Sequence, residues 1–194
     1  TQVLKEQLII LIRTGALRFT GKSKKQLLWD AHLLLGNRSK TTAGPKLFQS
    51  SQKKYQMPEL KDSQIEDAYD EMELLGFPVT VNYFDLLKTN FRGEIKAKNL
   101  INHVGKTVKM TGTLVTIKYV KTVRKEIMNF AAFTDPEGIF FDTVHFPDSL
   151  NKYPFQGHGV YLILGKVVQE FGFPSLEVQK MAKLPFKPNP RSEN

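Results

Sequence analysis

Residues 107–122 read TVKMTGTLVTIKYVKT, a long stretch rich in Val, Ile, Thr and Tyr. β-Branched and aromatic residues favour a pleated, half-buried backbone, so this stretch predicts a strand. Similar runs bounded by Gly and Pro follow it at 127–134, 138–146, 159–169 and 175–184. A tight turn is expected at Asp135-Pro136-Glu137-Gly138, between the second and third runs.

A short polar segment, 147–153, separates the third and fourth runs and has room for about two helical turns. Five short strands with one small helix between the third and fourth are typical of a Greek-key barrel, the OB-fold, which often binds oligonucleotides across its second and third strands and the adjoining loops. We therefore expect an α+β chain in which an N-terminal helical segment precedes a five-stranded OB-fold β-barrel.

The composition narrows the class of protein. The chain has 194 residues, no cysteine and a formal net charge of +9. Disulfides and thiolate metal sites are therefore excluded, and no apolar run approaches the ~20 residues of a membrane helix. No signal-peptide pattern opens the chain, and a cytoplasmic location is expected. The chain starts with Thr1 inside an expected helix, which suggests a piece of a longer protein.

The charge is unevenly distributed: basic residues dominate 1–60 and 91–194, and acidic residues dominate 61–90. Basic blocks suggest a polyanionic partner, because each neutralised phosphate releases condensed counterions. Lysine-rich surfaces also serve solubility, so charge alone leaves both readings open.

The chain divides into five expected parts. Residues 1–36 form a helical pair, with Ser23 and Gln26 at capping-box spacing. Residues 37–60 form a loop, 61–104 an acidic helix followed by a connector, 105–185 the barrel and 186–194 a tail. Within the connector, 82–88 predicts a short amphipathic helix. In the loop, Leu47 and Phe48 are an apolar pair suited to docking into another protein, although they could also fold back on the helices.

Binding of a single strand needs rings for bases to stack on and cations along the phosphates. The candidate cations cluster around the loop between the first and second strands, with Tyr119 among them: Lys118, Lys121, Arg124 and Lys125. This loop is one of the two with which the OB-fold commonly binds oligonucleotides.

Aromatic residues on the strands supply the candidate rings. Phe130 and Phe133 are three apart and must face opposite ways. We assign Phe133 inward and Phe130 outward, with the opposite assignment left open. Phe140 and Phe141 also face opposite ways, and their parity is not settled. Phe171 and Phe173, at the tip between the last two strands, are either a second stacking site or a lid over the barrel.

We expect no catalytic or metal site in this chain. The four histidines, His32, His103, His145 and His158, show no metal-ligand spacing. The carboxylates of 62–75 crowd the early turns of a helix, where the dipole favours negative charge. No phosphate-binding glycine loop or nucleophile elbow is present.

Several stretches, in their order and spacing, resemble the C-terminal part of the alpha (polymerase) subunit of bacterial DNA polymerase III. The resemblance spans nearly the whole chain and is carried by LIRTGA (11–16), 66–76 leading into LLGFP (74–78), GKTV (105–108), 130–135, DTVHFP (142–147) and GKVV (165–168).

The resemblance implies helix-hairpin-helix elements, a sliding-clamp-binding peptide, and an OB-fold near the single-stranded template. Leu47 and Phe48 match the hydrophobic end of the clamp peptide, but Gly44 stands where glutamine is expected. The first loop also lacks the family's turn glycine. Single-stranded DNA, the clamp and other holoenzyme subunits are the implied partners. The parent would be a nucleotidyltransferase whose Mg²⁺-binding aspartates lie in a palm domain that this chain does not resemble.

Two other functions stay open. Residues 130–135 followed by Gly138 also resemble the OB-fold anticodon-binding domains of aminoacyl-tRNA synthetases, which implies binding of RNA. Alternatively, the chain is a protein-docking module for the clamp and other holoenzyme subunits. Preference for DNA or RNA, oligomeric state and the parent's length do not follow from the sequence.

Overall fold

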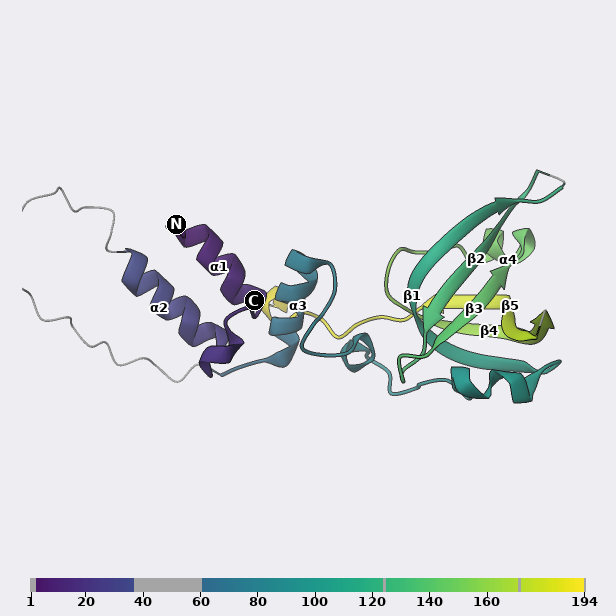
Figure 1. Cartoon of the computed structure of the whole chain (residues 1–194), viewed down its shortest axis with the longest axis horizontal. Helices are drawn as coiled ribbons and strands as arrows, with labels where there is room; N and C mark the ends of the chain where they lie inside the picture. The colour runs from purple at the N-terminus through teal and green to yellow at the C-terminus, as the bar shows by residue number, and fades with distance from the viewer. Residues whose placement is uncertain (1–2, 37–60, 124, 171, 194) are drawn as a thin grey trace, which may run out of the picture. The chain divides into compact units, whose positions relative to one another are not determined.

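The computed structural model describes residues 3–36, 61–123, 125–170 and 172–193 (Figure 1). The chain forms two compact units, Thr1–Val81 with Pro188–Asn194, and Asn82–Lys187. Residues 82–104, expected as part of a connector, thus belong with the barrel. The expected clamp-binding loop, with Leu47 and Phe48, lies outside the described residues, as do Arg124 and Phe171.

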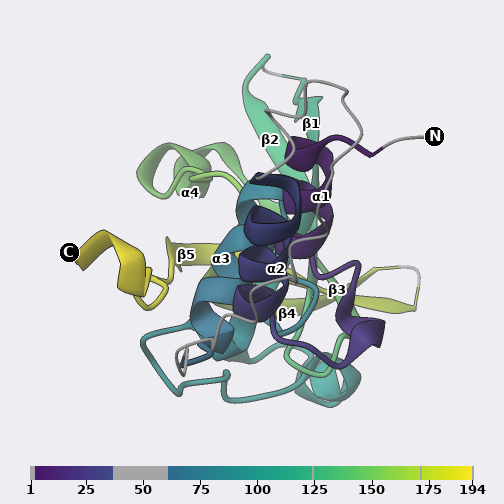
Figure 2. The ribbon, with the colours of Figure 1, turned by 90° about the vertical axis from the view of Figure 1, so that its left-hand side faces the viewer.

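The first unit is helical. It contains α1 (Lys5–Arg13), a 3₁₀ turn η1 (Arg18–Thr20), α2 (Lys24–Gly36) and α3 (Gln64–Leu75), with a further turn η5 (Pro190–Glu193). α1 packs against both α2 and α3 (Figure 2). The capping box before α2 is confirmed: Ser23 Oγ accepts from the Gln26 amide, and the Gln26 side chain accepts from the Ser23 amide.

The carboxylates of α3 hold the first unit together. Asp70 is buried and accepts hydrogen bonds from both Arg13 and Arg191. Glu71 is also buried, and one of its oxygens accepts from the backbone amides of Val79 and Thr80 at 2.7 and 2.9 Å. Burial of these charges is possible because each is paired and hydrogen-bonded. The two carboxylates thus have a structural role.

The second unit contains a closed five-stranded barrel with strand order β1-β2-β3-β5-β4. The strands are β1 (Thr107–Lys121), β2 (Ile127–Thr134), β3 (Phe140–His145), β4 (Val160–Glu170) and β5 (Phe173–Lys183). Only β3 and β5 pair in parallel, and β1 closes the barrel by pairing with β4. A short helix, α4 (Pro147–Lys152), joins β3 to β4. This is the expected OB-fold topology.

Two shorter elements precede the barrel. The expected helix at 82–88 is only a 3₁₀ turn, η3 (Tyr83–Leu86), because Leu87 is already extended and bridges to Phe186. The connector also contains η4 (Ala97–His103), whose Leu100 is buried in the barrel core. None of the helices in the described part of the chain is long and apolar enough to cross a membrane.

The core confirms the assignment of the β2 aromatics. Phe133 is fully buried and its ring stacks on that of Phe141, with centroids 5.6 Å apart. Phe130 is 43% exposed on the other face of the strand. The pairing of Phe133 with Phe141 also settles the parity in β3: Phe141 lies inside and Phe140 outside.

A close approach inside the barrel explains one glycine. A Cβ on Gly112 would lie 2.7 Å from the Phe141 ring, nearer than real Cβ atoms come. Glycine at this position of β1 therefore leaves room for the stacked pair in the core.

A bulge in β1 changes which side chains face outward. The register with β2 shifts between Leu114 and Thr116. Leu114 is buried before the bulge, and Ile117 packs on the core after it. Lys118 therefore faces outward, and Tyr119 has the inward parity.

Candidate nucleic-acid interface

The outer face of β2 and β3 carries an aromatic residue flanked by smaller side chains. Phe130 lies opposite Lys118 on β1 and opposite Val144 on β3. The next outward-facing residue of β2, Ala132, lies opposite Thr116 on β1 and Asp142 on β3. Directly opposite residues in a sheet share one face, so these side chains border a common surface.

A groove of about 430 Å³ lies over this surface. Its floor comes from β1, β2 and β3, and the hairpin between β4 and β5 forms one wall. The lining residues are Thr116 and Lys118 of β1, Phe130–Ala132 of β2, Asp142 and Val144 of β3, and Glu170, Phe173, Pro174 and Ser175 of the hairpin.

The groove unites three of the expected site residues. Phe130, Lys118 and Phe173 all line it, and Phe173 is 78% exposed. Pairing between β3 and β5 places Ser175 opposite Asp142, which brings the β4–β5 hairpin over the β2–β3 face. The two rings and the ammonium group therefore reach one ligand-sized space from three strands.

Other expected site residues lie elsewhere. Phe140 is exposed and shares the outward parity of Asp142, but it does not line the groove. Tyr119 and Lys121 have the parity opposite to Lys118. Tyr119 lines a different cavity, beside α4. Tyr119 and Phe130 are thus not neighbours on one stacking surface.

The loop between β1 and β2 has an unusual backbone position. Lys125 has φ 63°, the only positive value among the described residues other than glycine. Its amide donates to Thr122 O at 2.9 Å, and the Thr122 amide donates to Glu126 O at 2.8 Å. Lys125 thus takes the left-handed conformation that glycine adopts most easily, and its side chain is exposed.

The groove has charges of both signs. Lys118 is exposed at the edge of the groove, and Asp142 and Glu170, also exposed, line it as well. Carboxylates that line the groove oppose the approach of phosphates, although the solvent around exposed groups weakens this repulsion. The groove is therefore better suited to the bases of a strand than to a dense row of phosphates.

Several lining residues were not anticipated from the sequence. Asp142, Val144, Glu170 and Ser175 follow from the register of β3 with β2 and β5, which the sequence does not fix. The cavity beside α4 contains Asn129 and Phe155, which were also missed. Asn129 shares the parity of Phe133, so an inward amide could have been noticed once Phe133 was assigned to the core.

The described residues contain no group of three or more His, Asp or Glu side chains placed to hold a metal ion. His145 is buried, and its Nε2 donates to the Thr143 hydroxyl at 2.9 Å, because that hydroxyl itself donates to Ala131 O. Burial lowers the pKa of His145 to about 4, so the imidazole is neutral at pH 7.

Comparisons with known proteins give distant structural similarities. No protein-family model matches the sequence, and no curated protein matches it significantly. One similar solved structure is the single-stranded DNA-binding protein from Thermus aquaticus, with 14% identity and a TM-score of 0.38 over 42% of this chain and 41% of that chain. The match therefore spans about two fifths of the Thermus protein.

Two further structures have similar scores. The second OB-fold domain of replication protein A from Methanococcus maripaludis has 10% identity and a TM-score of 0.33, over 44% of this chain and 90% of that one. The N-terminal domain of PriB protein from Thermoanaerobacter tencongensis has 9% identity and a TM-score of 0.34, over 41% and 96% of the two chains. These values identify no function for this chain.

Proposed function

We propose that the barrel binds single-stranded DNA in the groove over β2 and β3, with little sequence preference. The observation that carries this proposal is the convergence of Phe130, Phe173 and Lys118 on one groove of an OB-fold. Exposed rings offer stacking surfaces that accept any base, and such stacking is worth about 1–3 kcal/mol per base.

Phe130 is the central stacking residue in this proposal. Its position between β1 and β3 fixes the ring in the middle of the face, and its exposed fraction leaves one side of the ring open. Phe173 stacks on a neighbouring base from the hairpin. Lys118 pairs with a phosphate at the groove. Lys125, exposed in the loop that follows β1, is a further candidate cation.

We further propose, from the sequence resemblance, that the chain is a piece of a bacterial DNA polymerase III alpha subunit. The barrel would hold template strand for a parent that transfers nucleotides in its palm domain with Mg²⁺. The described residues offer no cluster for that metal, so no step of the transfer is assigned to them. Leu47 and Phe48 would contact the sliding clamp, alongside contacts with other holoenzyme subunits in the cytoplasm.

Fluorescence anisotropy tests the DNA-binding proposal. The full chain is titrated into a labelled oligothymidylate of about 12 nucleotides, within the usual site sizes of about 4–16 nucleotides. We expect binding that weakens with salt, and Phe130→Ala should lower the affinity at least about fivefold. Phe91→Ala is the matched control, because Phe91 is 40% exposed and lines none of the described cavities.

Competition experiments separate the other functions. A tRNA anticodon stem-loop that displaces the oligothymidylate at far lower concentration than unlabelled DNA would favour RNA as the ligand. Absence of oligonucleotide binding, or affinity unchanged by both salt and Phe130→Ala, would overturn the proposal. Clamp binding that is lost with Leu47→Ala and Phe48→Ala, together with no DNA binding, would favour the docking function.

A further inference from the structure

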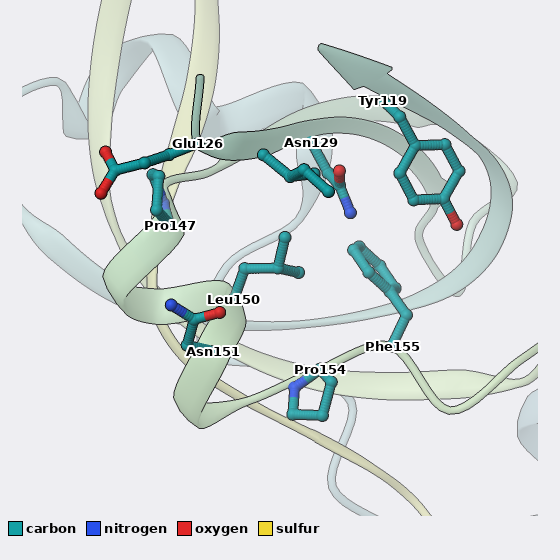
Figure 3. Close-up of a pocket in the computed structure, with 9 residues that line it drawn as sticks. Tyr119, Glu126, Asn129, Pro147, Leu150, Asn151, Pro154 and Phe155 are labelled. Atoms are coloured by element: carbon teal, nitrogen blue, oxygen red, sulfur yellow. The ribbon is translucent and has the colours of Figure 1, made fainter. Parts of the chain in front are cut away.

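A second cavity, of about 500 Å³, lies beside α4 (Figure 3). Tyr119 and Asn129 reach it from β1 and β2, and Leu150 and Phe155 reach it from α4 and the segment that follows. The strand residues have the parity opposite to Lys118 and Phe130, so the cavity and the groove lie on different faces of the β1–β2 ribbon. The volume is within the range of small-molecule sites.

Asn129 presents an unsatisfied polar group at this cavity. The residue is 2% exposed, and its Oδ1 has no hydrogen-bond partner among the described residues. Leaving such an atom unpaired in the interior is unfavourable, so buried polar groups are almost always satisfied. Since an amide has both a donor and an acceptor, a ligand that offers the complementary pair would satisfy it.

Two aromatic rings border the same space. Phe155 is half-buried and held in place by the His145 ring, with centroids 4.6 Å apart, and by Tyr161 at 6.0 Å. Tyr119 is 69% exposed, so its ring remains open to contact. Figure 3 shows the Asn129 amide above the ring of Phe155, with the ring of Tyr119 to one side. A flat ligand would therefore meet rings as well as the amide.

The charge of the lining residues excludes one class of ligand. Glu126 is the only charged residue among those that line the cavity, and none of them is Lys or Arg. A carboxylate among the lining residues, with no Lys or Arg among them, disfavours phosphate and other anions in the cavity. It favours instead a neutral group that carries hydrogen-bond donors.

We propose that this cavity binds one unpaired nucleobase with an exocyclic amine, with a preference for adenine, and that the Asn129 amide forms hydrogen bonds with the edge of that base. An asparagine amide pairs bidentately with adenine through one donor and one acceptor. The proposal rests on the proposed function in taking nucleic acid as the ligand, but a free nucleoside without phosphate is enough to test it.

Nuclear magnetic resonance of the ¹⁵N-labelled full chain provides the test. Adenosine should shift the side-chain amide signal of Asn129 and the backbone signals of Tyr119 and Leu150, with at least about fivefold tighter binding than thymidine. Asn129→Leu keeps the size of the side chain and removes the amide, so it should retain the fold and lose at least about fivefold in adenosine affinity. Tyr119→Ala, at an exposed position, provides a second variant with the same expected direction.

Phe130→Ala separates this proposal from the DNA-binding groove. It should weaken oligothymidylate binding and leave adenosine binding unchanged. If the wild-type chain binds oligothymidylate but adenosine shifts no cavity signal, the base-reading proposal is overturned and the groove stands. If adenosine binds through Asn129 but oligothymidylate does not bind, the groove fails and the cavity stands. Equal affinity for thymidine, or unchanged binding by Asn129→Leu, also overturns base reading.

Discussion

Lys118 and Asp142 line the same groove from β1 and β3, with β2 between them. Lys118 lies opposite Phe130, and Asp142 lies opposite the neighbouring outward residue, Ala132. No ion pair joins the two side chains within the described part of the chain. A strand that stacks on Phe130 therefore meets the attractive charge of Lys118 and the repulsive charge of Asp142 within the same groove, which Glu170 also lines.

Neutralising each charge should shift DNA affinity in opposite directions. We expect Asp142→Asn to tighten oligothymidylate binding about threefold, because an exposed like charge acts through screened solvent. Lys118→Gln should weaken binding and reduce the slope of log affinity against log salt by about 0.7. Anisotropy titrations at several salt concentrations measure both effects. Unchanged affinity in both variants would place the phosphates outside the groove.

The sequence is sufficient to predict the barrel because its strand runs are rich in β-branched and aromatic residues and are bounded by Gly and Pro. The bounds of β2, Ile127–Thr134, agree with the expectation, and so does the assignment of Phe133 to the interior. Phe140 and Phe141 could not be assigned in the same way, since two adjacent phenylalanines satisfy either parity. Only the pairing of Phe141 with Phe133 decides between them.

The site is less predictable because it depends on a bulge and on pairing between distant strands. Counting alternate residues from Leu114 would place Lys118 inside and Tyr119 outside. The register shift before Thr116 reverses this order. Ser175 reaches Asp142 through the parallel pairing of β3 with β5, about 30 residues apart along the chain, which no local pattern encodes.

The backbone of Lys125 predicts a stabilising substitution. A non-glycine residue in the left-handed region costs about 1–2 kcal/mol. Glycine avoids this cost, but part of the gain in stability is lost because glycine has more conformational freedom in the unfolded chain. We expect Lys125→Gly to raise the free energy of unfolding by up to about 1 kcal/mol. Lys125→Gln, which keeps the Cβ and removes the charge, is the control. Thermal denaturation followed by circular dichroism compares them, and a lower stability for the glycine variant would contradict this account.

The buried imidazole of His145 predicts a pH-dependent barrel. Its pKa is about 4 in the folded state and 6.5 in an unperturbed state, because burial penalises the charged form. The unfolded chain therefore binds the proton first, and stability is full above about pH 6.5 and falls as the pH drops toward 4. At about 1.4 kcal/mol per pH unit, lowering the pH from 7.5 to 5.5 should cost about 1 kcal/mol.

Urea denaturation at the two pH values measures this loss. His145→Gln can still donate a hydrogen bond to Thr143 but does not titrate, so the variant should lose about 1 kcal/mol less than the wild type over the same interval. Each variant is compared with itself at the two pH values, which separates the titration from any change in packing. Equal losses in the two proteins would show that His145 is not the titrating group.

The paired carboxylate of Asp70 leads to a prediction about the stability of the helical unit. Burial alone would raise the pKa of Asp70, but hydrogen bonds from Arg191 and Arg13 together outweigh it and hold the pKa below the usual value. Because both arginines are partly exposed, Asp70→Asn should cost about 2–3 kcal/mol at pH 7, somewhat less than a fully buried pair. Glu73→Gln, which removes an exposed partner of Arg13, should cost under about 1 kcal/mol.

Trp29 in α2 is the only tryptophan in the sequence, so its fluorescence reports unfolding of this unit. The difference between wild type and Asp70→Asn should narrow as the pH falls below 3.8, where the unfolded carboxyl takes up its proton. Equal costs for the two variants at pH 7 would contradict the structural role of Asp70.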